Sequence, residues 1–285
     1  MSIIVKQMSK SFGNHVILDD ISFEVPKGEI IGLIGENGVG KTTLIRCMMN
    51  IDSEYQGEVS FGGDTNLIPD TFNRVSLLHD NRVLYPQMSA YDHLLFLANI
   101  YHLDKTRITE VADQVGIQSY LHQKTGEYSL GMKQHLLIAM AIINSPTYLI
   151  MDEPFNALDP TSVLTLKKLI QQLKNKGVTI LLSSHNLSLI QDLTNQVYLL
   201  KHARLTSILL NEEQHQVHYL TLSNKIDISD ILRDLNLDFT RDEDSWNIRG
   251  EIVPLMNQLI ERQIKIECIQ SRHVSLEEIY QTLYE

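Results

Sequence analysis

The sequence predicts an α/β domain over residues 1–204, followed by a small α+β domain over residues 205–285. Three patterns support this division. A glycine-rich loop lies between a short β-branched apolar run and a helical pattern in "EIIGLIGENGVGKTTLIRCMM". A second apolar run, "TYLIMDEP", stops at two acidic residues before a turn. Beyond residue 204, strand and helix patterns alternate in the order of a split βαβ unit.

The sequence predicts a globular chain, and we expect it to stay in the cytosol. It has 285 residues, of which 43% are hydrophobic, enough to bury a sizeable core. No apolar run reaches the roughly 20 residues that span a bilayer, and the N-terminus lacks a signal-peptide pattern. Cys47 and Cys268 belong to no CxxC or Cys/His cluster, so we expect buried structural thiols rather than a disulfide or a zinc site.

The charge is acidic and unevenly distributed. The net charge is −11, and residues 205–285, with 7 Lys and Arg against 15 Asp and Glu, contribute −8 of it. The sequence has no Lys/Arg cluster, which is the usual electrostatic footprint of a nucleic-acid-binding protein. We therefore do not expect nucleic acid as a partner.

The glycine-rich stretch "GENGVGKT", from Gly35 to Thr42, matches the phosphate-loop pattern G-x-x-x-x-G-K-[ST] in its strand–loop–helix context. Loop amides and the helix N-terminus converge there on one anion. Lys41 would contact the β and γ phosphates, and the Thr42 hydroxyl would ligate Mg²⁺. The predicted nucleotide-binding residues of this loop are Gly35, Glu36, Asn37, Gly38, Val39, Gly40, Lys41, Thr42 and Thr43.

Two carboxylates follow the apolar run of "TYLIMDEP". Adjacent residues of a strand point to opposite faces, so Asp152 and Glu153 should have separate roles. We expect Asp152 to hold Mg²⁺ through water and Glu153 to orient and polarise the attacking water. An acid beside the metal-binding residue distinguishes a hydrolase from a phosphoryl-transfer enzyme that activates no water.

The stretch "YSLGMKQ" resembles the signature motif of the ATP-binding subunits of ABC transporters, and the resemblance extends over residues 1–204. It implies a P-loop NTPase with a RecA-like core, an antiparallel β subdomain and a helical subdomain at about residues 86–145. In that family the signature serine and glycine contact the γ-phosphate held by the opposite subunit. These are Ser129 and Gly131 here, although Ser129 alone would be interpreted as a helix N-cap.

Other family elements occur in the same order. "NALDP" resembles the D-loop, which crosses between paired subunits, and His185 after "TILLSS" matches the switch histidine that reaches the γ-phosphate. Phe12 in "SKSFGNHV" matches the aromatic residue on which adenine stacks, usually a tyrosine. A core aromatic of a leading hairpin is the alternative for Phe12.

Some positions depart from the family pattern. Alignment on "LYP" places Asp80 where a glutamine usually ligates Mg²⁺, and Asp is a shorter, charged oxygen ligand. In the signature, Leu130 replaces glycine, Met132 replaces glutamine and His135 replaces arginine. Such "SLGM" variants resemble exporter subunits for peptides, antibiotics and other amphiphiles. The second domain ends in "SLEEIYQTL", as in that exporter branch, and it shows no catalytic constellation.

The resemblance implies an ATPase that works as a dimer, with two ATP molecules sandwiched between two subunits. The partners would be a second ATPase subunit, identical or related, and a polytopic membrane permease that holds the chain at the inner face of the cell membrane. Permease contacts are expected around residues 80–97, where Tyr85 and Tyr91 are either contact residues or ordinary packing. The alternative function is a soluble ABC ATPase of translation or DNA repair. A phosphate-loop kinase or a switch GTPase is disfavoured because neither class is expected to carry the signature motif.

Overall fold

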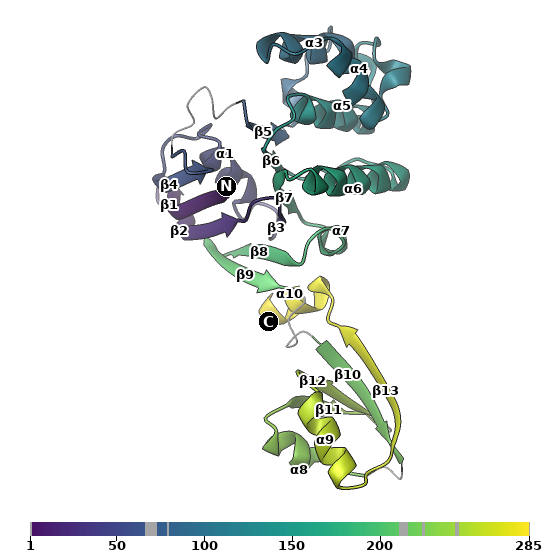
Figure 1. The fold of residues 1–285 in the computed structure, drawn as a ribbon. Coiled ribbons are helices and arrows are strands. Elements are labelled where there is room, and N and C mark those ends of the chain that lie inside the picture. Colours follow the sequence, from purple (N-terminus) through teal and green to yellow (C-terminus); the bar gives the residue numbers. More distant parts are fainter. Residues whose placement is uncertain are drawn as a thin grey trace. The chain divides into compact units, whose positions relative to one another are not determined.

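The computed structural model describes residues 2–65, 73–78, 80–210, 216–223, 226–242 and 245–284. The chain divides into two compact units, Met1–Ile208 and Leu209–Glu285 (Figure 1). The domain boundary predicted after residue 204 falls at the start of strand β9 (Arg204–Leu209), which pairs within the sheet of the first unit. Across the described residues, every helix is too short or too polar to cross a membrane.

The first unit is built on a six-stranded sheet in the order β5-β6-β7-β3-β8-β9. Its other strands are β3 (Ile30–Ile34), β5 (Val75–Leu78), β6 (Tyr148–Met151), β7 (Thr179–Ser184) and β8 (Gln196–Lys201). The pairs from β5 through β8 are parallel, and β3, β6 and β7 are buried along their whole length. Strands of a parallel sheet that is covered on both faces are apolar throughout, which explains these sequences. The residues that follow β3, β6 and β7 therefore meet at one edge of the sheet.

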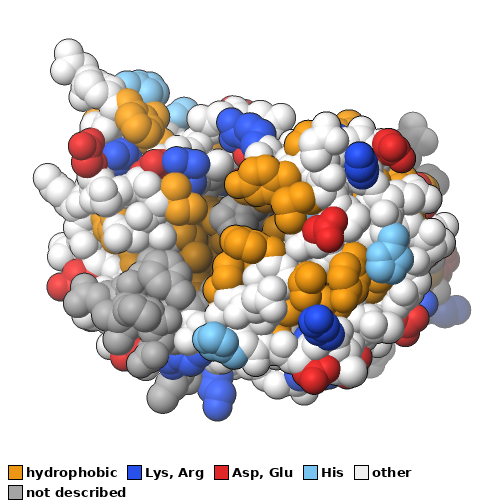
Figure 2. Space-filling model, turned by 90° about the horizontal axis from the view of Figure 1, so that it is seen from above, with side chains coloured by type: hydrophobic (Ala, Val, Ile, Leu, Met, Phe, Trp, Pro, Cys, Tyr) orange, Lys and Arg blue, Asp and Glu red, His pale blue; other side chains and the backbone are white. Residues whose placement is uncertain are grey.

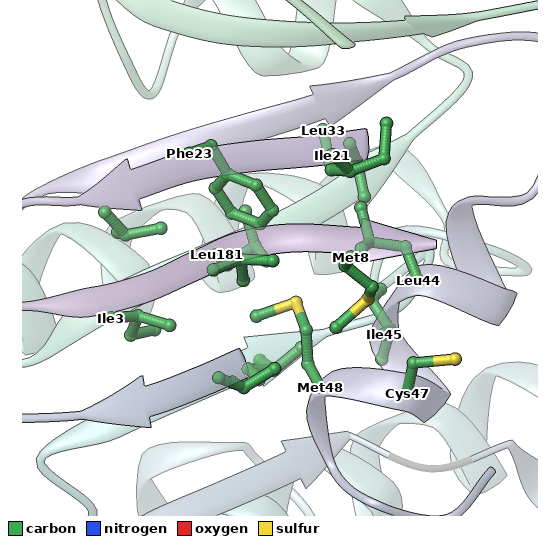
Figure 3. Packing of buried hydrophobic residues seen from close by; sticks show 14 of the residues in the cluster. Ile3, Met8, Ile21, Phe23, Leu33, Leu44, Ile45, Cys47, Met48 and Leu181 are labelled. Carbon is green, nitrogen blue, oxygen red and sulfur yellow. The ribbon is translucent and has the colours of Figure 1, made fainter. Parts of the chain in front are cut away.

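A three-stranded antiparallel sheet, β2-β1-β4, covers the helix that follows the glycine-rich loop. These elements are β1 (Ile3–Phe12), β2 (His15–Val25), β4 (Gln56–Phe61) and α1 (Lys41–Met48). In the core between them, Met8 and Phe23 of the sheet belong to the same buried cluster as Leu44 of α1 and Leu181 of β7 (Figure 3). This packing fixes α1 between the two sheets.

Helices fill the segment between β5 and β6. They are η1 (Asn81–Val83), α3 (Ala90–Ile100), α4 (Thr106–Gln114), η2 (Gln118–Tyr120), η3 (Thr125–Glu127) and α5 (Leu130–Ile142). A capping box starts α3, in which Ser89 Oγ accepts from the Asp92 amide at 3.1 Å and the Ser89 amide donates to Asp92 Oδ2 at 2.9 Å. At the C-terminal end of α5, the Arg107 side chain donates hydrogen bonds to the carbonyls of Ile142 and Ile143 at 3.1 and 3.0 Å. Two further helices, α6 (Pro160–Asn175) and α7 (Leu187–Gln191), follow β6 and β7.

The second unit holds a four-stranded antiparallel sheet in the order β11-β12-β10-β13. Its elements are β10 (Gln216–Leu222), α8 (Ser229–Asp234), β11 (Asp238–Arg241), β12 (Trp246–Arg249), α9 (Val253–Glu261), β13 (Ile266–His273) and α10 (Leu276–Tyr284). This is the predicted β-α-β-β-α-β order with one more helix. Leu220, Trp246 and Ile248 of the sheet belong to one buried cluster with residues of α8 and α9.

The prediction of two buried thiols is half wrong. Cys47 is buried in α1, and burial raises the pKa of its thiol. Cys268 is exposed, as are most side chains on both faces of β13, which is an edge strand of its sheet. The apolar alternation of "IKIECIQ" identifies a strand, but it does not distinguish an edge strand from a central one.

Candidate active site

The glycine-rich loop joins β3 to α1 through backbone conformations that only glycine adopts readily. Gly35 has φ +152° and Gly40 has φ +117°. A Cβ at Gly35 would lie 2.6 Å from the Leu200 carbonyl oxygen, and one at Gly40 would lie 2.8 Å from Ile17 Cγ2. Gly40 caps α1 without any side-chain hydrogen bond, so the first amides of α1 are available to an anion.

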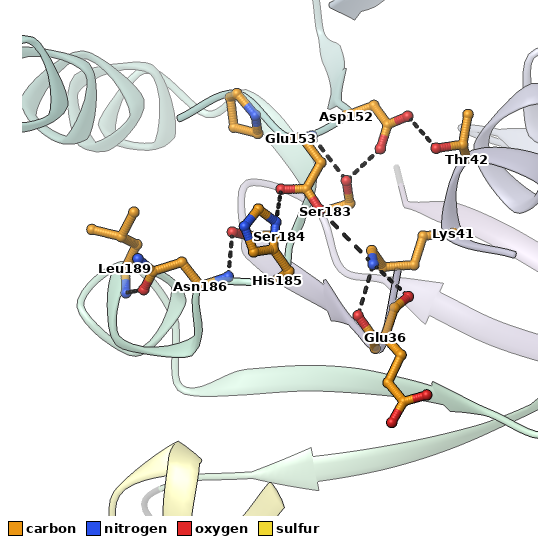
Figure 4. A network of polar contacts seen from close by, with 12 residues as sticks. Glu36, Lys41, Thr42, Asp152, Glu153, Ser183, Ser184, His185, Asn186 and Leu189 are labelled. Atoms are coloured by element: carbon orange, nitrogen blue, oxygen red, sulfur yellow. Dashed lines mark hydrogen bonds and ion pairs between the residues drawn. The ribbon is translucent and has the colours of Figure 1, made fainter. Parts of the chain in front are cut away.

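Lys41 is a buried cation, with only 6% of its side chain exposed. Its Nζ donates to the carbonyl oxygens of Gly35 at 2.7 Å and Glu36 at 3.1 Å (Figure 4). Glu153 Oε1 lies 3.8 Å from the same nitrogen. Burial lowers the Lys41 pKa, while the charges of Glu153 and Asp152 oppose that shift. The ammonium is therefore held inside the loop, between backbone oxygens and a carboxylate.

The carboxylate of Asp152 links three elements. Its Oδ2 accepts from Thr42 Oγ1 of α1 at 2.7 Å, and its Oδ1 accepts from Ser183 Oγ of β7 at 2.5 Å. Ser183 Oγ accepts in turn from the Glu153 amide at 2.9 Å. Ser183 is not among the residues predicted from the sequence. Its place two residues before His185, at the carboxyl end of a buried strand, is the signal that could have identified it.

Thr42 and Asp152 are suited to a magnesium ion. Mg²⁺ is a hard cation that takes oxygen ligands, and it is usually bound by one or two carboxylates together with the phosphates of its nucleotide. A hydroxyl and a carboxylate that already contact each other beside a phosphate loop fit that requirement. Among the described residues, no group of three or more acidic, histidine or cysteine side chains is placed to hold a metal ion.

Glu153 stands on a turn. Strand β6 ends at Met151, and Glu153 takes a left-handed conformation with φ +48°. The two acids therefore diverge because the strand ends before them, and the predicted strand alternation is not the reason. Glu153 Oε2 lies 2.9 Å from His185 Nδ1, so one carboxylate contacts both the lysine and the histidine. A non-glycine residue in this conformation is uncommon, and such strain often occurs at functional sites.

The signature residues lie at the N-terminus of α5. Ser129 caps this helix, and its Oγ accepts from the Met132 amide at 3.2 Å. A Cβ on Gly131 would lie 3.1 Å from the Ala157 carbonyl oxygen, so this end of α5 packs closely on the segment after Glu153. Gln134 Nε2 adds a hydrogen bond to the Pro154 carbonyl at 2.8 Å. None of these contacts joins the signature residues to the Lys41 network of the described chain.

The two remaining predicted residues have other neighbours. Phe12 ends β1 with 55% of its side chain exposed, so it is not a core aromatic, and the ammonium of Lys10 lies 4.9 Å from its ring centre. Asp80 caps η1, where its carboxylate accepts from the Arg82 amide at 2.9 Å and from Arg82 Nε at 2.8 Å. Arg82 thus forms an ion pair with the predicted metal ligand Asp80.

Comparison with known proteins places these features in a family. The family model described as "ABC transporter" matches residues 18–156, and one described as "AAA domain, putative AbiEii toxin, Type IV TA system" matches residues 123–191. The lantibiotic transport ATP-binding protein SrtF of Streptococcus pyogenes is 34% identical to this chain, over 67% of this chain and 83% of its own length. The chain belongs to the ABC transporter ATP-binding proteins.

Two further relatives agree with this assignment. The bacitracin transport ATP-binding protein BcrA of Bacillus licheniformis is 34% identical, over 72% of this chain and 69% of its own. A solved structure titled as the ATP-binding subunit of an ABC transporter superposes with a TM-score of 0.68 at 25% identity, covering 83% of this chain and 94% of that one. The ABC protein is thus a P-loop NTPase that binds ATP. It is an ATPase, as the sequence predicted.

Proposed function

We propose that this ABC protein is the ATP-hydrolysing motor subunit of a membrane transporter that exports peptides, antibiotics or other amphiphilic compounds. The observation that carries the proposal is the contact of one carboxylate, on Glu153, with both Lys41 and His185, next to the Thr42–Asp152 pair. The cargo class is supported by relatives named for lantibiotic and bacitracin transport.

In the proposed reaction, the amides of the loop and of α1 bind the phosphates of ATP, and Lys41 adds a positive charge. Thr42 and Asp152 would hold Mg²⁺, which neutralises phosphate charge when bound. Glu153 orients and polarises the attacking water. His185 holds the Glu153 carboxylate in place through the 2.9 Å contact and would contact the γ-phosphate, as the switch histidine of the family does.

A second subunit completes the site in this proposal. Ser129 and Gly131 stand at the N-terminus of α5, where the helix dipole favours an anion. Because their contacts are to their own helix and to the segment after Glu153, they would serve a nucleotide bound by the partner subunit. That partner is another copy of this chain or a related chain with the same motifs.

The permease would dock in an apolar hollow next to α3. The hollow has a volume of about 580 Å³, and hydrophobic side chains gather around it on the face shown in Figure 2. Its lining includes Val75, Leu77, Val83, Tyr85, Met88, Phe96, Leu97, Tyr101, Leu137 and Met140. His93 fixes one wall, because its ring accepts from the Tyr85 amide at 2.9 Å and contacts the Ser89 carbonyl at 2.7 Å. Tyr85 lines the hollow and is 66% exposed, so it is the better docking candidate. Tyr91 is only partly exposed and lies outside the lining, where it packs on His122 with ring centres 5.1 Å apart.

The first test is purification of the tagged chain from detergent-solubilised membranes of its own cell. We expect a polytopic membrane protein to co-purify and to raise ATP hydrolysis. Phe96→Asp should lose this partner, since it puts a charge on a side chain that lines the hollow and is 61% exposed. Leu164→Asp on α6, a 59% exposed leucine outside the hollow, is the matched control and should keep the partner. Recovery with ribosomes or DNA instead would replace the export proposal by the soluble alternative.

Asp80 gives a separate prediction. If it takes the place of the usual glutamine, Asp80→Gln should retain ATP hydrolysis within about threefold, because an amide oxygen also ligates Mg²⁺. Arg82→Gln, which removes the cation paired with Asp80, should lower the Mg²⁺ concentration needed for half-maximal hydrolysis. Measuring turnover against Mg²⁺ for both variants decides the role. An inactive Asp80→Gln protein that still folds and binds ATP would show that the aligned position or its role is wrong.

A further inference from the structure

Lys10 is a buried cation next to an exposed aromatic ring. Only 5% of its side chain is exposed, and its Nζ donates to the Glu54 carbonyl oxygen at 2.6 Å. The same ammonium lies 4.9 Å from the centre of the Phe12 ring, whose side chain is 55% exposed. We propose that Lys10 is a positioning residue, which holds the Phe12 ring so that its open face receives the adenine base. This inference rests on the proposed role of Phe12 as the adenine platform.

The Phe12 ring offsets part of the free-energy cost of burying the Lys10 ammonium. A buried ammonium is costly unless it is paired and hydrogen-bonded. The nearby carboxylate of Asp52 is already engaged by Arg46, with hydrogen bonds of 2.8 and 2.9 Å. The Glu54 carbonyl supplies one hydrogen bond, and the negative face of the Phe12 ring supplies electrostatic attraction. A ring that turned away would lose this attraction, so the cation favours one orientation.

The hairpin that carries Phe12 borders the phosphate loop. Phe12 pairs with His15 across the turn from β1 to β2. Two residues later, Ile17 is the side chain that a Cβ on Gly40 would touch at 2.8 Å. A hollow of about 470 Å³, lined by residues of β2 and by Gly38 and Val39 of the loop, opens beside this contact. A base attached to phosphates in the loop therefore lies within reach of this hairpin.

A ring already held in one orientation costs a ligand less to order when it stacks. The lysine covers one face, so the base stacks on the other, and Phe retains that face without the hydroxyl of a tyrosine. Lys10 should therefore affect affinity only for ligands that carry a base. Phosphate binding in the loop should not depend on it.

The test compares binding of ATP and of inorganic tripolyphosphate, each with Mg²⁺, to the full chain. We expect Lys10→Met to weaken ATP binding about two- to fivefold, the size of a partly exposed cation–π contact, and to leave tripolyphosphate binding unchanged. In a Phe12→Leu background, Lys10→Met should have no further effect. Lys10→Gln removes the charge but keeps a donor for the Glu54 carbonyl. It should show the same loss of ATP affinity, and it replaces Lys10→Met in the comparison if that variant folds poorly. Melting temperatures of all variants identify any loss of fold.

The outcomes separate the two proposals. If Phe12→Leu leaves ATP binding unchanged, Phe12 is not the adenine platform, and both its proposed role and this inference are wrong. If Phe12→Leu weakens ATP binding but neither Lys10 variant does, the platform stands and the positioning role of Lys10 is overturned. Equal weakening of ATP and tripolyphosphate by the folded Lys10 variants would also overturn it, since Lys10 would then act on the loop or the fold.

Discussion

Glu153→Gln should reduce ATP hydrolysis by about 100- to 10,000-fold, the usual contribution of a positioned general base, while the protein still binds ATP. The amide keeps the shape of the side chain but cannot accept the proton of the attacking water. It also removes a negative charge next to Lys41, where our proposal places the γ-phosphate, so the proposed ATP-bound dimer should persist. Steady-state hydrolysis and light scattering with and without ATP measure both effects.

Glu58→Gln is the matched control for this variant. It makes the same chemical change at an exposed glutamate of β4, outside the predicted nucleotide-binding residues. We expect near-normal turnover and no ATP-dependent dimer trap. A Glu153→Gln protein that hydrolyses ATP like the unmodified chain would remove Glu153 from the proposed mechanism. If Glu153→Gln loses turnover as expected but forms no ATP-dependent dimer, the result would instead count against a site completed by a second subunit.

The phosphate loop and the order of elements in the second unit could be predicted because their signals are local. Residues Gly35 to Thr42 are contiguous, and the strand and helix around them have their own apolar patterns. In the second unit, each strand and helix follows from its own periodicity. Only neighbouring residues are needed for either inference.

Contacts between distant residues could not be predicted in this way. Ser183 meets Asp152 because β6 and β7 pair with Met151 opposite Leu182, and a one-residue slip of that register would break the contact. Glu153 takes a left-handed conformation that no local pattern of "MDEP" requires. Burial of Lys10 within "MSKSFG" is likewise a tertiary effect, since lysine is rarely buried and nothing in that stretch indicates it.

Lys41→Ala should lower affinity for both ATP and tripolyphosphate by about 10- to 100-fold, because a charge-assisted contact to the phosphates is worth roughly 1.5–3 kcal/mol. Isothermal titration with each ligand measures the loss. Lys27→Ala, at an exposed lysine in the turn before β3, changes the net charge equally and should bind both ligands normally. The equal effect on the two ligands distinguishes Lys41, which contacts phosphate, from Lys10, which should affect ATP alone. Unchanged affinity in Lys41→Ala would contradict the phosphate-loop assignment.

The same variant should not lower the stability of the unliganded protein. Burial lowers the Lys41 pKa in the folded chain, so the folded state binds this proton less tightly than the unfolded state does. The charge therefore costs stability at neutral pH, and that cost diminishes as the pH rises from the folded-state pKa towards the unfolded-state pKa. Lys41→Ala should consequently melt at the same temperature as the unmodified chain or higher, while the rise in its melting temperature at a given nucleotide concentration becomes smaller. A large drop in the unliganded melting temperature would show that Lys41, through the Gly35 and Glu36 carbonyls, is needed to hold the loop itself.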